Sequence, residues 1–406
     1  MNTILQEAKR IEDAIVKDRR YLHQNAETGH DLPVTTAYVT KRLEEMGYVP
    51  QVIAKSAIVV TVGGKRPGKT FLLRGDMDAL PIKEETNLPF RSGTPNMHAC
   101  GHDTHTAMLL GAAKLLKDHE DEIEGTVKLM FQPAEEILSG AKAMIAAGLL
   151  ENPRVDAAAM IHIFSGMPVP AGTLIVPKAG EVSASADMFH IEIIGKGGHG
   201  AMPNLSVDPL NVASHIFIAL QELIAREIEP GNTTVLTVGQ LHGGNAANII
   251  PDTAYLEGTI RCFDNEERNY LKRRVEEVAK GVAAVFRADA AVEFPIGCPS
   301  VYNDPKLYKQ LLSINRNLLG EENVTGFEAA YPTGRMSGSE DFGYVSEKVP
   351  SVMMVLGGGS PEQGYPYPQH HPKVDFCEDT FHIGTAVLVN TALEWLKEEA
   401  AAHNNN

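Results

Sequence analysis

The chain has 406 residues, 43% hydrophobic and 22% charged, so it is long enough for two or three domains with ordinary cores. Its formal net charge of −16 argues against nucleic acid or an anionic membrane as a partner, because both require a basic surface. No apolar run approaches the roughly 20 residues of a membrane span, and the charged N-terminal segment is unlike a signal peptide. These features predict a cytoplasmic protein whose four scattered cysteines are reduced.

Strand and helix patterns alternate in the first part of the chain. Helical periodicity is seen over residues 3–25, from Thr35 to Gly47 and from Thr104 to Lys117. Apolar and β-branched runs predict strands over residues 56–62, 70–76, 126–132 and 155–164. This alternation is typical of an α/β domain with a mostly parallel sheet.

The pattern changes between residues 184 and 295. There it predicts strand, helix, strand, strand, helix and strand, which is the order of a ferredoxin-like α+β domain. A helix, a strand and a last helix then resume the α/β pattern. We therefore predict a discontinuous α/β domain over residues 1–183 and 296–406, interrupted by an inserted domain over residues 184–295.

Two glycine-rich stretches match nucleotide-binding patterns but lack the surroundings that such patterns need. GGKRPGKT, from Gly63 to Thr70, fits the phosphate-binding loop, but a strand follows where a helix N-terminus would have to hold the phosphate. We expect a hairpin turn there. GKGGHG, from Gly195 to Gly200, lies outside any nucleotide-binding unit, and only His199 is kept from it as a candidate site residue.

The densest group of metal-capable side chains lies in the stretch MHACGHDTHT, residues 97–106. Its members are His98, Cys100, His102, Asp103 and His105. Thiolate and imidazole are preferred ligands of borderline transition metals, and carboxylates complete such sites. Each residue alone has an ordinary explanation, such as a small buried cysteine or a polar helix N-terminus, but their density predicts a metal site.

Further metal-capable residues follow the predicted strands, where the active site of an open α/β sheet lies. They are Asp76, Asp78, Glu135, Glu136, His162, His370 and His371. Separately they would be turn carboxylates, helix N-terminal charges, a core histidine and loop residues. Their agreement in position predicts that a single site gathers them. One of the paired glutamates would bind metal while the other serves as general base, and the spacing alone leaves their roles open.

Six motifs, in order, resemble the metallopeptidase-type amidohydrolase family of aminoacylases and carboxypeptidases, in particular its hippurate hydrolases and indole-acetyl-amino-acid hydrolases. They are RGDMDALPI, MHACGHDTHTAMLLGAA, FQPAEE, GKGGHGAMP with VDP, GGNAANIIP and SGSEDF. The resemblance covers nearly the whole chain. It implies a catalytic domain of the dinuclear metallo-exopeptidase type, an inserted lid and dimerisation domain, and hence a homodimer or higher homo-oligomer.

The resemblance also implies roles for most of the candidate residues. Two divalent ions per subunit, Mn²⁺ or Zn²⁺ with Co²⁺ or Ni²⁺ as alternatives, would be held by Cys100, His102, Glu136, His162 and His370. The other roles are general base for Glu135, oxyanion stabilisation for His199, substrate contact for Asn248, and support from outside the ligand set for Asp78 and Asp103. His370 is preferred to His371 because it stands two positions before the segment PKVDF.

The favoured hypothesis is metal-dependent hydrolysis of the amide bond of N-acyl amino acids or small peptides, with a metal-activated water and Glu135 as base. One alternative is a hydrolase with Cys100 as nucleophile, and another is a non-catalytic metal-binding protein. The chain departs from the family pattern at Ala26, often proline, and at the Phe-Ser-Gly of residues 164–166, where an aromatic-proline pair is usual. The second departure lies beside the site and leaves the preferred acyl group and amino acid open.

Overall fold

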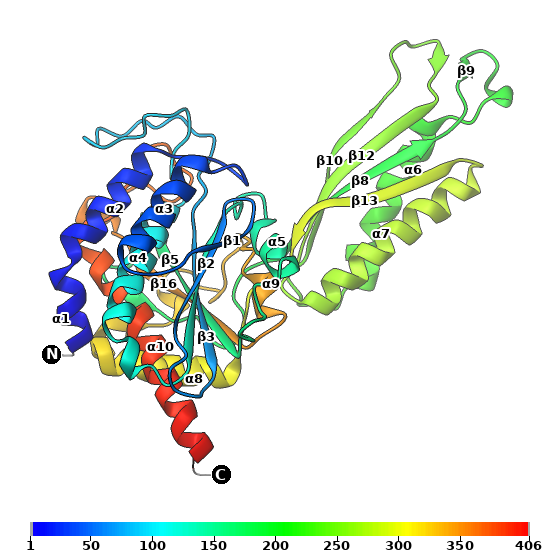
Figure 1. Cartoon of the computed structure of the whole chain (residues 1–406). Helices are drawn as coiled ribbons and strands as arrows, with labels where there is room; N and C mark the ends of the chain where they lie inside the picture. Colours follow the sequence, from blue (N-terminus) through cyan, green and yellow to red (C-terminus); the bar gives the residue numbers. More distant parts are fainter. Residues whose placement is uncertain (1–2, 405–406) are drawn as a thin grey trace. The chain divides into compact units, whose positions relative to one another are not determined.

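The computed structural model describes residues 3–404, and the chain divides into two compact units (Figure 1). The second unit comprises Ser183–Ser300 and Ser337–Glu340, and the first unit comprises the remainder. The second unit extends beyond residue 295, where the insert was expected to end, because its last strand continues to Cys298. It also includes a short later segment that the sequence pattern did not assign to it.

The first unit is built on a mixed sheet. In order across the sheet, its strands are β1 (Gln51–Ala54), β2 (Ala57–Gly63), β4 (Thr126–Gln132), β3 (Thr70–Asp76), β5 (Ala157–Phe164), β16 (Ser351–Gly357), β6 (Leu174–Ile175) and β15 (Val324–Thr325). The central strands β4, β3, β5 and β16 run parallel, and nearly all their residues are buried, as in sheets covered on both faces. The α/β fold with a parallel centre is therefore as predicted.

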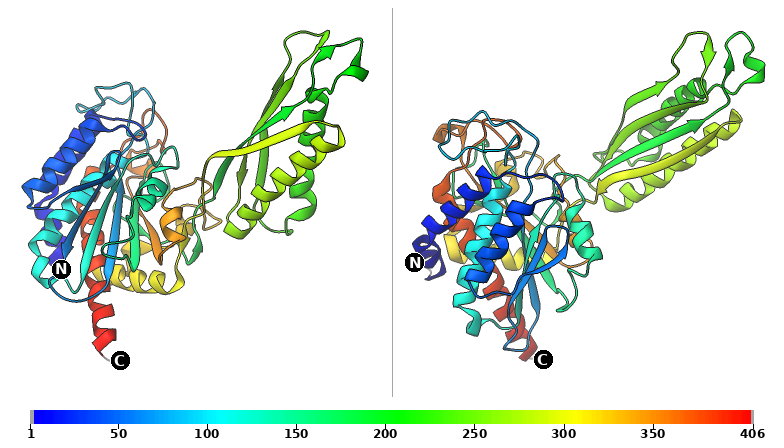
Figure 2. Two further views of the ribbon diagram at one scale, coloured as in Figure 1. Left: turned by 45° about the vertical axis from the view of Figure 1, so that its right-hand side comes forward. Right: turned by 45° about the horizontal axis from the view of Figure 1, so that its top comes forward.

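Helices cover both faces of this sheet. They are α1 (Thr3–Arg10), α2 (Glu12–Gln24), α3 (Pro33–Glu45), α4 (His102–Asp118), α5 (Gly140–Ala146), α8 (Pro305–Leu319), α9 (Gly343–Ser346) and α10 (Phe381–Asn404). On one face α4 and α10 pack on β3, and α1 and α2 pack on these helices (Figures 1 and 2). Phe71 and Leu73 point into that layer, whereas Leu72 points to the core shared with α5 and α9. None of the helices within residues 3–404 has the length and hydrophobicity of a membrane span.

Two local predictions in this unit were wrong. The segment from Gly63 to Thr70 is not a hairpin turn, because β4 lies between β2 and β3 and the segment joins strands that do not pair. The helix expected over residues 3–25 is divided at Ile11 into α1 and α2. The first error concerns strand order, which is set by contacts distant in sequence and which local periodicity does not report.

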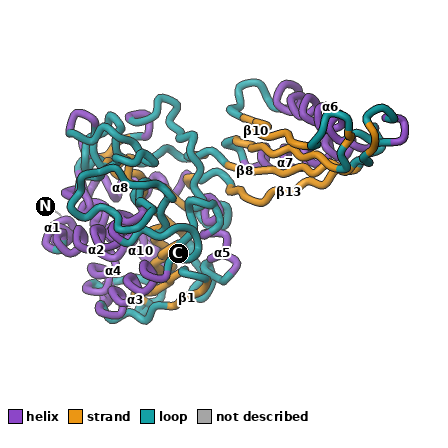
Figure 3. The backbone as a smooth tube through the Cα atoms, turned by 90° about the horizontal axis from the view of Figure 1, so that it is seen from above, coloured by secondary structure: helices purple, strands orange, loops and turns teal. Residues whose placement is uncertain are grey.

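The second unit is an antiparallel sheet packed against α6 and α7 (Figure 3). Its elements are β8 (Ala186–Ile194), β9 (Gly198–His199), α6 (Pro209–Glu222), β10 (Val235–Gly243), β11 (Ile249–Ile250), β12 (Thr253–Arg261), α7 (Asn265–Val285) and β13 (Asp289–Cys298). The main sheet has the order β10-β12-β8-β13, and each neighbouring pair is antiparallel. This is the order of a ferredoxin-like unit. The ribbon β9-β11 is separate from that sheet.

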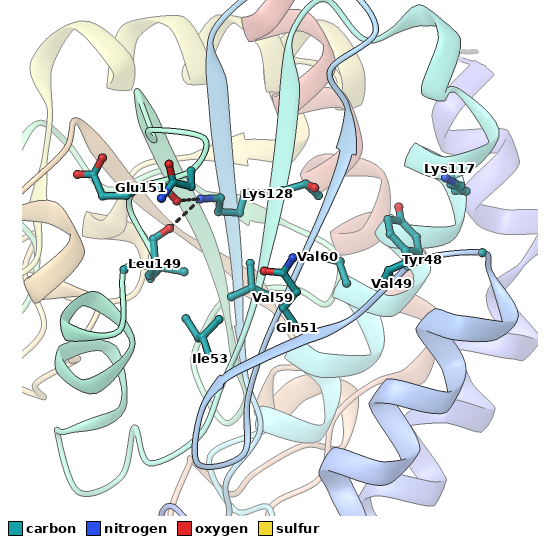
Figure 4. Close-up of a pocket in the computed structure, with 14 residues that line it drawn as sticks. Tyr48, Val49, Gln51, Ile53, Val59, Val60, Lys117, Lys128, Leu149 and Glu151 are labelled. Carbon is teal, nitrogen blue, oxygen red and sulfur yellow. Dashed lines mark hydrogen bonds between the residues drawn. The ribbon is translucent and has the colours of Figure 1, made fainter.

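Lys128 on β4 is a buried cation that secures the loop after α5. Its ammonium donates to the carbonyl oxygens of Leu149 and Glu151 at 2.9 and 2.8 Å (Figure 4). It also donates to the carbonyl oxygen of Pro153 at 2.8 Å. Burial lowers the pKa of this ammonium to about 8. A cavity of about 320 Å³ lies beside it, bordered by Tyr48 on the other side. Because three carbonyl groups occupy all three N–H donors of Lys128, we assign this residue a structural role and do not assign it a role in ligand binding.

Candidate metal centre

The carboxyl ends of the parallel strands carry the predicted site residues. Asp76 is the last residue of β3, Glu135 and Glu136 follow β4, and His162 lies near the end of β5. The loop after β16 brings His370 to the same place. Because parallel strands end on the same edge of a sheet, side chains from these segments meet although they are far apart in sequence.

Cys100 and His102 enter this edge from the start of α4. Between them Gly101 has φ 93°, and a Cβ at this position would come within 2.6 Å of the side chain of Ile163. Only glycine adopts this conformation readily and allows such a close approach. The tight turn therefore places a thiol and an imidazole together against β5.

Potential ligand atoms form overlapping groups, and within each group the atoms lie within 4.8 Å of one another. Three of these groups contain the candidate residues alone: Cys100 with His102 and His162, Cys100 with Glu136 and His370, and His102 with Glu135 and Glu136. The five residues expected to bind metal, hereafter the ligand set, are thus brought together. Cys100 belongs to the first two groups, as a residue bridging two ions would.

Backbone carbonyls orient the two buried imidazoles of the ligand set. His102 Nδ1 donates to the carbonyl of Asp78 at 2.9 Å, and His162 Nδ1 donates to the carbonyl of Ile163 at 2.7 Å. Each ring is left with Nε2 as its lone-pair nitrogen, and His162 Nε2 lies 3.5 Å from Cys100 Sγ. Hydrogen bonds of this kind fix the tautomer and orientation of metal-binding histidines.

The donor atoms fit a divalent cation. Among the described residues, His102 Nε2 and Glu136 Oε1 are buried without a hydrogen-bond partner. Burial raises the pKa of the Glu136 carboxyl to about 7 and the pKa of the Cys100 thiol well above its ordinary value. A cation would compensate these buried groups, and thiolate, imidazole and carboxylate ligands together suit Zn²⁺, Mn²⁺ or Co²⁺.

The carboxylate of Asp78 is hydrogen-bonded to the backbone of both paired glutamates. Its Oδ1 accepts the backbone N–H of Glu135 at 3.0 Å, and its Oδ2 accepts that of Glu136 at 3.2 Å. Glu135 Oε2 and Glu136 Oε1 lie 3.8 and 3.9 Å from His102 Nε2. Both carboxylates therefore reach the cluster, but Glu136 alone also groups with Cys100. This difference supports Glu136 as the ligand and leaves Glu135 beside it.

His370 faces the cluster, whereas His371 does not. His370 Nε2 lies 3.7 Å from Glu136 Oε2. His371 instead accepts the backbone N–H of Lys373 at Nδ1, at 3.0 Å, and its ring stacks on Tyr367 with centroids 4.3 Å apart. The geometry therefore favours His370, the residue preferred from the sequence.

Asp103, expected to support the site, points towards α2. Its Oδ2 accepts hydrogen bonds from Arg19 Nε at 2.9 Å and His23 Nδ1 at 2.8 Å. It thereby anchors the first turn of α4, next to His102. His98 is fully buried and belongs to none of the ligand groups of the described residues, and burial lowers its pKa to about 3. Neither residue adds a donor to the ligand set.

Sequence reasoning left two neighbours of the ligand set without a role, Asp76 and His105. They form a further group with His102, and His105 Nδ1 lies 2.6 Å from Asp76 Oδ1. Burial would raise the pKa of Asp76, but Arg74, His102 and His105 hold it well below its ordinary value. The available signal was spacing, because His105 follows His102 by three positions and shares its helix face.

In the second unit, a short ribbon brings His199 and Asn248 together. β9 pairs with β11 so that His199 lies opposite Ile249, and the N–H of Gly200 donates to the carbonyl of Asn248 at 2.9 Å. His199 Nδ1 accepts the N–H of Ala201 at 3.1 Å, so the neutral ring carries its proton on Nε2. Both predicted residues therefore share one exposed tip.

An aromatic cluster begins beside His162. Phe164 lies two positions later on the same side of β5, and the centroids of the two rings are 5.0 Å apart. Phe164 in turn lies 6.1 Å from Phe327 and 6.4 Å from Tyr331 between ring centroids. Phe327 is buried, whereas Phe164 and Tyr331 are partly exposed. The cluster therefore offers apolar surface next to a member of the ligand set.

The fold and the clustered ligands are those of a metallohydrolase. The chain belongs to peptidase family M20/M25/M40, whose sequence profile matches residues 72–394. It is 40% identical over 395 residues to IAA-amino acid hydrolase ILR1-like 2 of Arabidopsis thaliana, covering 96% of this chain and 87% of the relative. It is 37% identical over 333 residues to the hippurate hydrolase of Campylobacter jejuni, covering 82% of this chain and 84% of the relative.

A solved structure agrees with this assignment. The Bacillus subtilis YXEP protein, described as a dinuclear metal binding peptidase of the M20 family, matches with a TM-score of 0.78 and 32% identity. The match covers 96% of this chain and 99% of that chain. The resemblance found in the motifs is confirmed, and the chain is an enzyme, a hydrolase of this family.

Proposed function

We propose that this enzyme hydrolyses the amide bond of N-acyl amino acids or small peptides, using two divalent metal ions held by the ligand set. The observation that carries the proposal is the convergence of these five residues at the strand ends, with a further carboxylate, Glu135, beside them. The two curated relatives support the substrate class, since their names describe hydrolases of an amino acid conjugate and of hippurate.

Glu135 is the proposed general base. The bound ions would polarise the amide carbonyl and make a water molecule more acidic. Glu135 takes the proton from this water and then delivers it to the nitrogen of the leaving amine. Its backbone N–H is held by Asp78, and its carboxylate reaches to 3.8 Å from His102 Nε2, so the group is fixed next to the ligand set.

The tip of the second unit supplies the remaining proposed roles. His199 donates its Nε2–H to the oxyanion that forms at the amide carbonyl, and Asn248 contacts the substrate. The hydrogen bond from Ala201 to His199 Nδ1 supports this role, because it leaves Nε2 as the donor. His199 and Asn248 lie on the same ribbon, β9-β11, and both are exposed, so both are available to a substrate.

The Cys100-nucleophile alternative loses support. A nucleophilic cysteine needs a lowered thiol pKa, but burial raises the pKa of Cys100 well above its ordinary value. A role as nucleophile would also not explain why Cys100 lies close to both Glu136 and His370. A role as a metal ligand does explain this grouping.

Metal removal tests the reaction class. We expect that protein stripped by a chelator and confirmed to be metal-free loses activity on a panel of N-acyl amino acids. Mn²⁺, Zn²⁺ or Co²⁺ should restore that activity, because every member of the ligand set is a metal donor. Undiminished turnover by the metal-free protein would refute the proposal.

The aromatic cluster favours substrates with a ring next to the scissile amide. We expect Phe164→Ala to lower kcat/KM for an N-benzoyl amino acid about tenfold, because a ring-to-ring contact contributes roughly 0.5–1.5 kcal/mol beyond area burial. The N-acetyl derivative of the same amino acid should change by less than about twofold. Steady-state kinetics on the two substrates measures the difference, and an equal loss on both would show that Phe164 does not select the acyl group.

We also propose that the second unit mediates a homodimer. On α6, Ile218 is 64% exposed and Phe217 is 38% exposed, and the adjacent β10 is an edge strand. Exposed apolar side chains beside a strand edge favour association. Light scattering should give twice the 44.0 kDa chain mass, and a monomer at working concentration would contradict the proposal.

A further inference from the structure

Strands β3 and β5 separate before they reach the candidate metal centre. Their parallel ladder ends at the pair Arg74↔Met160, whereas β5 continues to Phe164 along its other neighbour, β16. His162 therefore lies on a stretch of β5 that β3 no longer supports. Backbone groups that face this gap need partners other than β3, because buried N–H groups are almost always hydrogen-bonded.

His105 fills the gap between the two strands. Its Nε2 accepts the backbone N–H of Ile163 at 2.8 Å, and its Nδ1 donates to Asp76 Oδ1 at 2.6 Å. Since Nε2 accepts a hydrogen bond, the proton of the neutral ring must be on Nδ1, facing the carboxylate. A carboxylate and an imidazole thus connect the end of β3 to β5 where ladder hydrogen bonds have stopped.

This bridge contacts both buried histidines of the ligand set. Asp76 Oδ2 lies 3.4 Å from His102 Nε2. The ring of His105 packs edge-on against the ring of His162, with centroids 4.6 Å apart. His102 comes from α4 and His162 from β5, so the bridge contacts both elements that carry these histidines.

Asp76 is itself held in place by a buried network. Arg74 Nη1 bonds Asp76 Oδ2 at 2.6 Å, and Arg74 Nε donates to Gln132 Oε1 at 2.9 Å. Gln132 Nε2 in turn donates to Asp341 Oδ1 at 2.6 Å. All four side chains are buried, so the carboxylate has little freedom to rotate. Movement of the bridge would require the network to be broken.

We propose that Asp76 and His105 are positioning residues that set the separation of His102 and His162 for metal binding. The inference rests on the proposed function, because it assumes that these histidines bind metal. A purely structural bridge would lower the stability of the first unit without changing metal affinity. A positioning bridge must change the affinity itself.

Metal affinity in the variants His105→Leu and His105→Gln distinguishes these two roles. Leucine removes both hydrogen bonds, whereas the glutamine Oε1 can still accept the N–H of Ile163. We expect His105→Leu to bind one of two Zn²⁺ ions about 10–100-fold more weakly, measured by competition with a chromophoric chelator, and His105→Gln to retain more of the affinity. The absorption spectrum of the Co²⁺-loaded protein should change in parallel, because ligand geometry changes.

Thr385→Val provides the matched control. Its hydroxyl donates to the carbonyl of Met108 on α4 at 3.1 Å, so the variant also loses a buried hydrogen bond to this helix, away from the bridge. We expect its Zn²⁺ affinities to remain within about twofold of the wild type. If His105→Leu does not fold, Asp76→Asn, which keeps an acceptor oxygen, is measured in its place.

The outcomes separate this inference from the function on which it rests. Variants that bind both ions within about twofold of the wild-type affinities would overturn the positioning role and leave the proposed function intact. A folded wild type that binds no Zn²⁺ would overturn the metal-dependent function itself, and the positioning role with it. Weaker binding in the His105 variants but not in Thr385→Val is the result expected here.

Discussion

Glu135→Gln is expected to lower kcat/KM for N-acyl amino acids by about 10²–10⁴-fold, the range contributed by a general base. The amide is nearly the same size as the carboxylate and keeps the backbone N–H that Asp78 holds, so the loop should retain its shape. What is lost is the group that takes the proton from water. The metal content of the purified variant should match that of the wild type, measured by elemental analysis.

Glu136→Gln is the matched control, because the carboxylates of Glu135 and Glu136 lie at almost the same distance from His102 Nε2. Glu136 is assigned to the ligand set, so its variant should lose metal and regain part of its activity when excess metal is added. Glu135→Gln should stay inactive at any metal concentration. If the two variants behaved in the opposite way, the roles of the two glutamates would have to be exchanged.

The sequence was sufficient to predict that the site residues lie on one edge of the sheet, because that position depends on the topology of parallel strands. Parallel strands end on one edge, so Glu136 and His162 were expected on the same edge of the sheet, and they meet because only β3 lies between β4 and β5. The alternating pattern was sufficient to establish such a sheet. The preference for His370 over His371 came from a motif, and the side-chain directions in the structure favour the same residue.

The remaining features depend on contacts that no local pattern encodes. The segment from Gly63 to Thr70 looked like a hairpin, because the sequence does not reveal that β4 inserts between its flanking strands. The pairing of Asp76 with His105 depends on where β3 and β5 separate, which is a property of the folded sheet. Asp103 was expected to support the site from outside the ligand set, and no local pattern showed that its partner would be a buried arginine of α2.

That arginine, Arg19, links three parts of the first unit. Its Nε donates to Asp103 Oδ2 at 2.9 Å on α4, and both side chains are fully buried. Its Nη1 donates to Glu378 Oε1 at 3.1 Å, just before α10. The guanidinium also lies over the ring of Phe90, 4.7 Å from its centroid. Arg19 therefore neutralises a buried carboxylate that neighbours His102 in sequence.

Arg19→Met is expected to lower the free energy of unfolding of the first unit by about 3–5 kcal/mol, because Asp103 would keep a buried charge without its main partner. Arg20→Met is the control, since Arg20 is 47% exposed and bonds the same Glu378, and surface pairs contribute less than about 1 kcal/mol.

Trp395, the only tryptophan of the sequence, packs on Phe71 in this unit, so urea unfolding followed by its fluorescence measures both variants. Similar small losses in the two variants would mean that the Arg19–Asp103 pair is not what fixes the start of α4. A large loss for Arg19→Met alone would show that a residue of α2 stabilises the start of α4, the helix that carries His102. This support comes from outside the strands that lead to the other ligands.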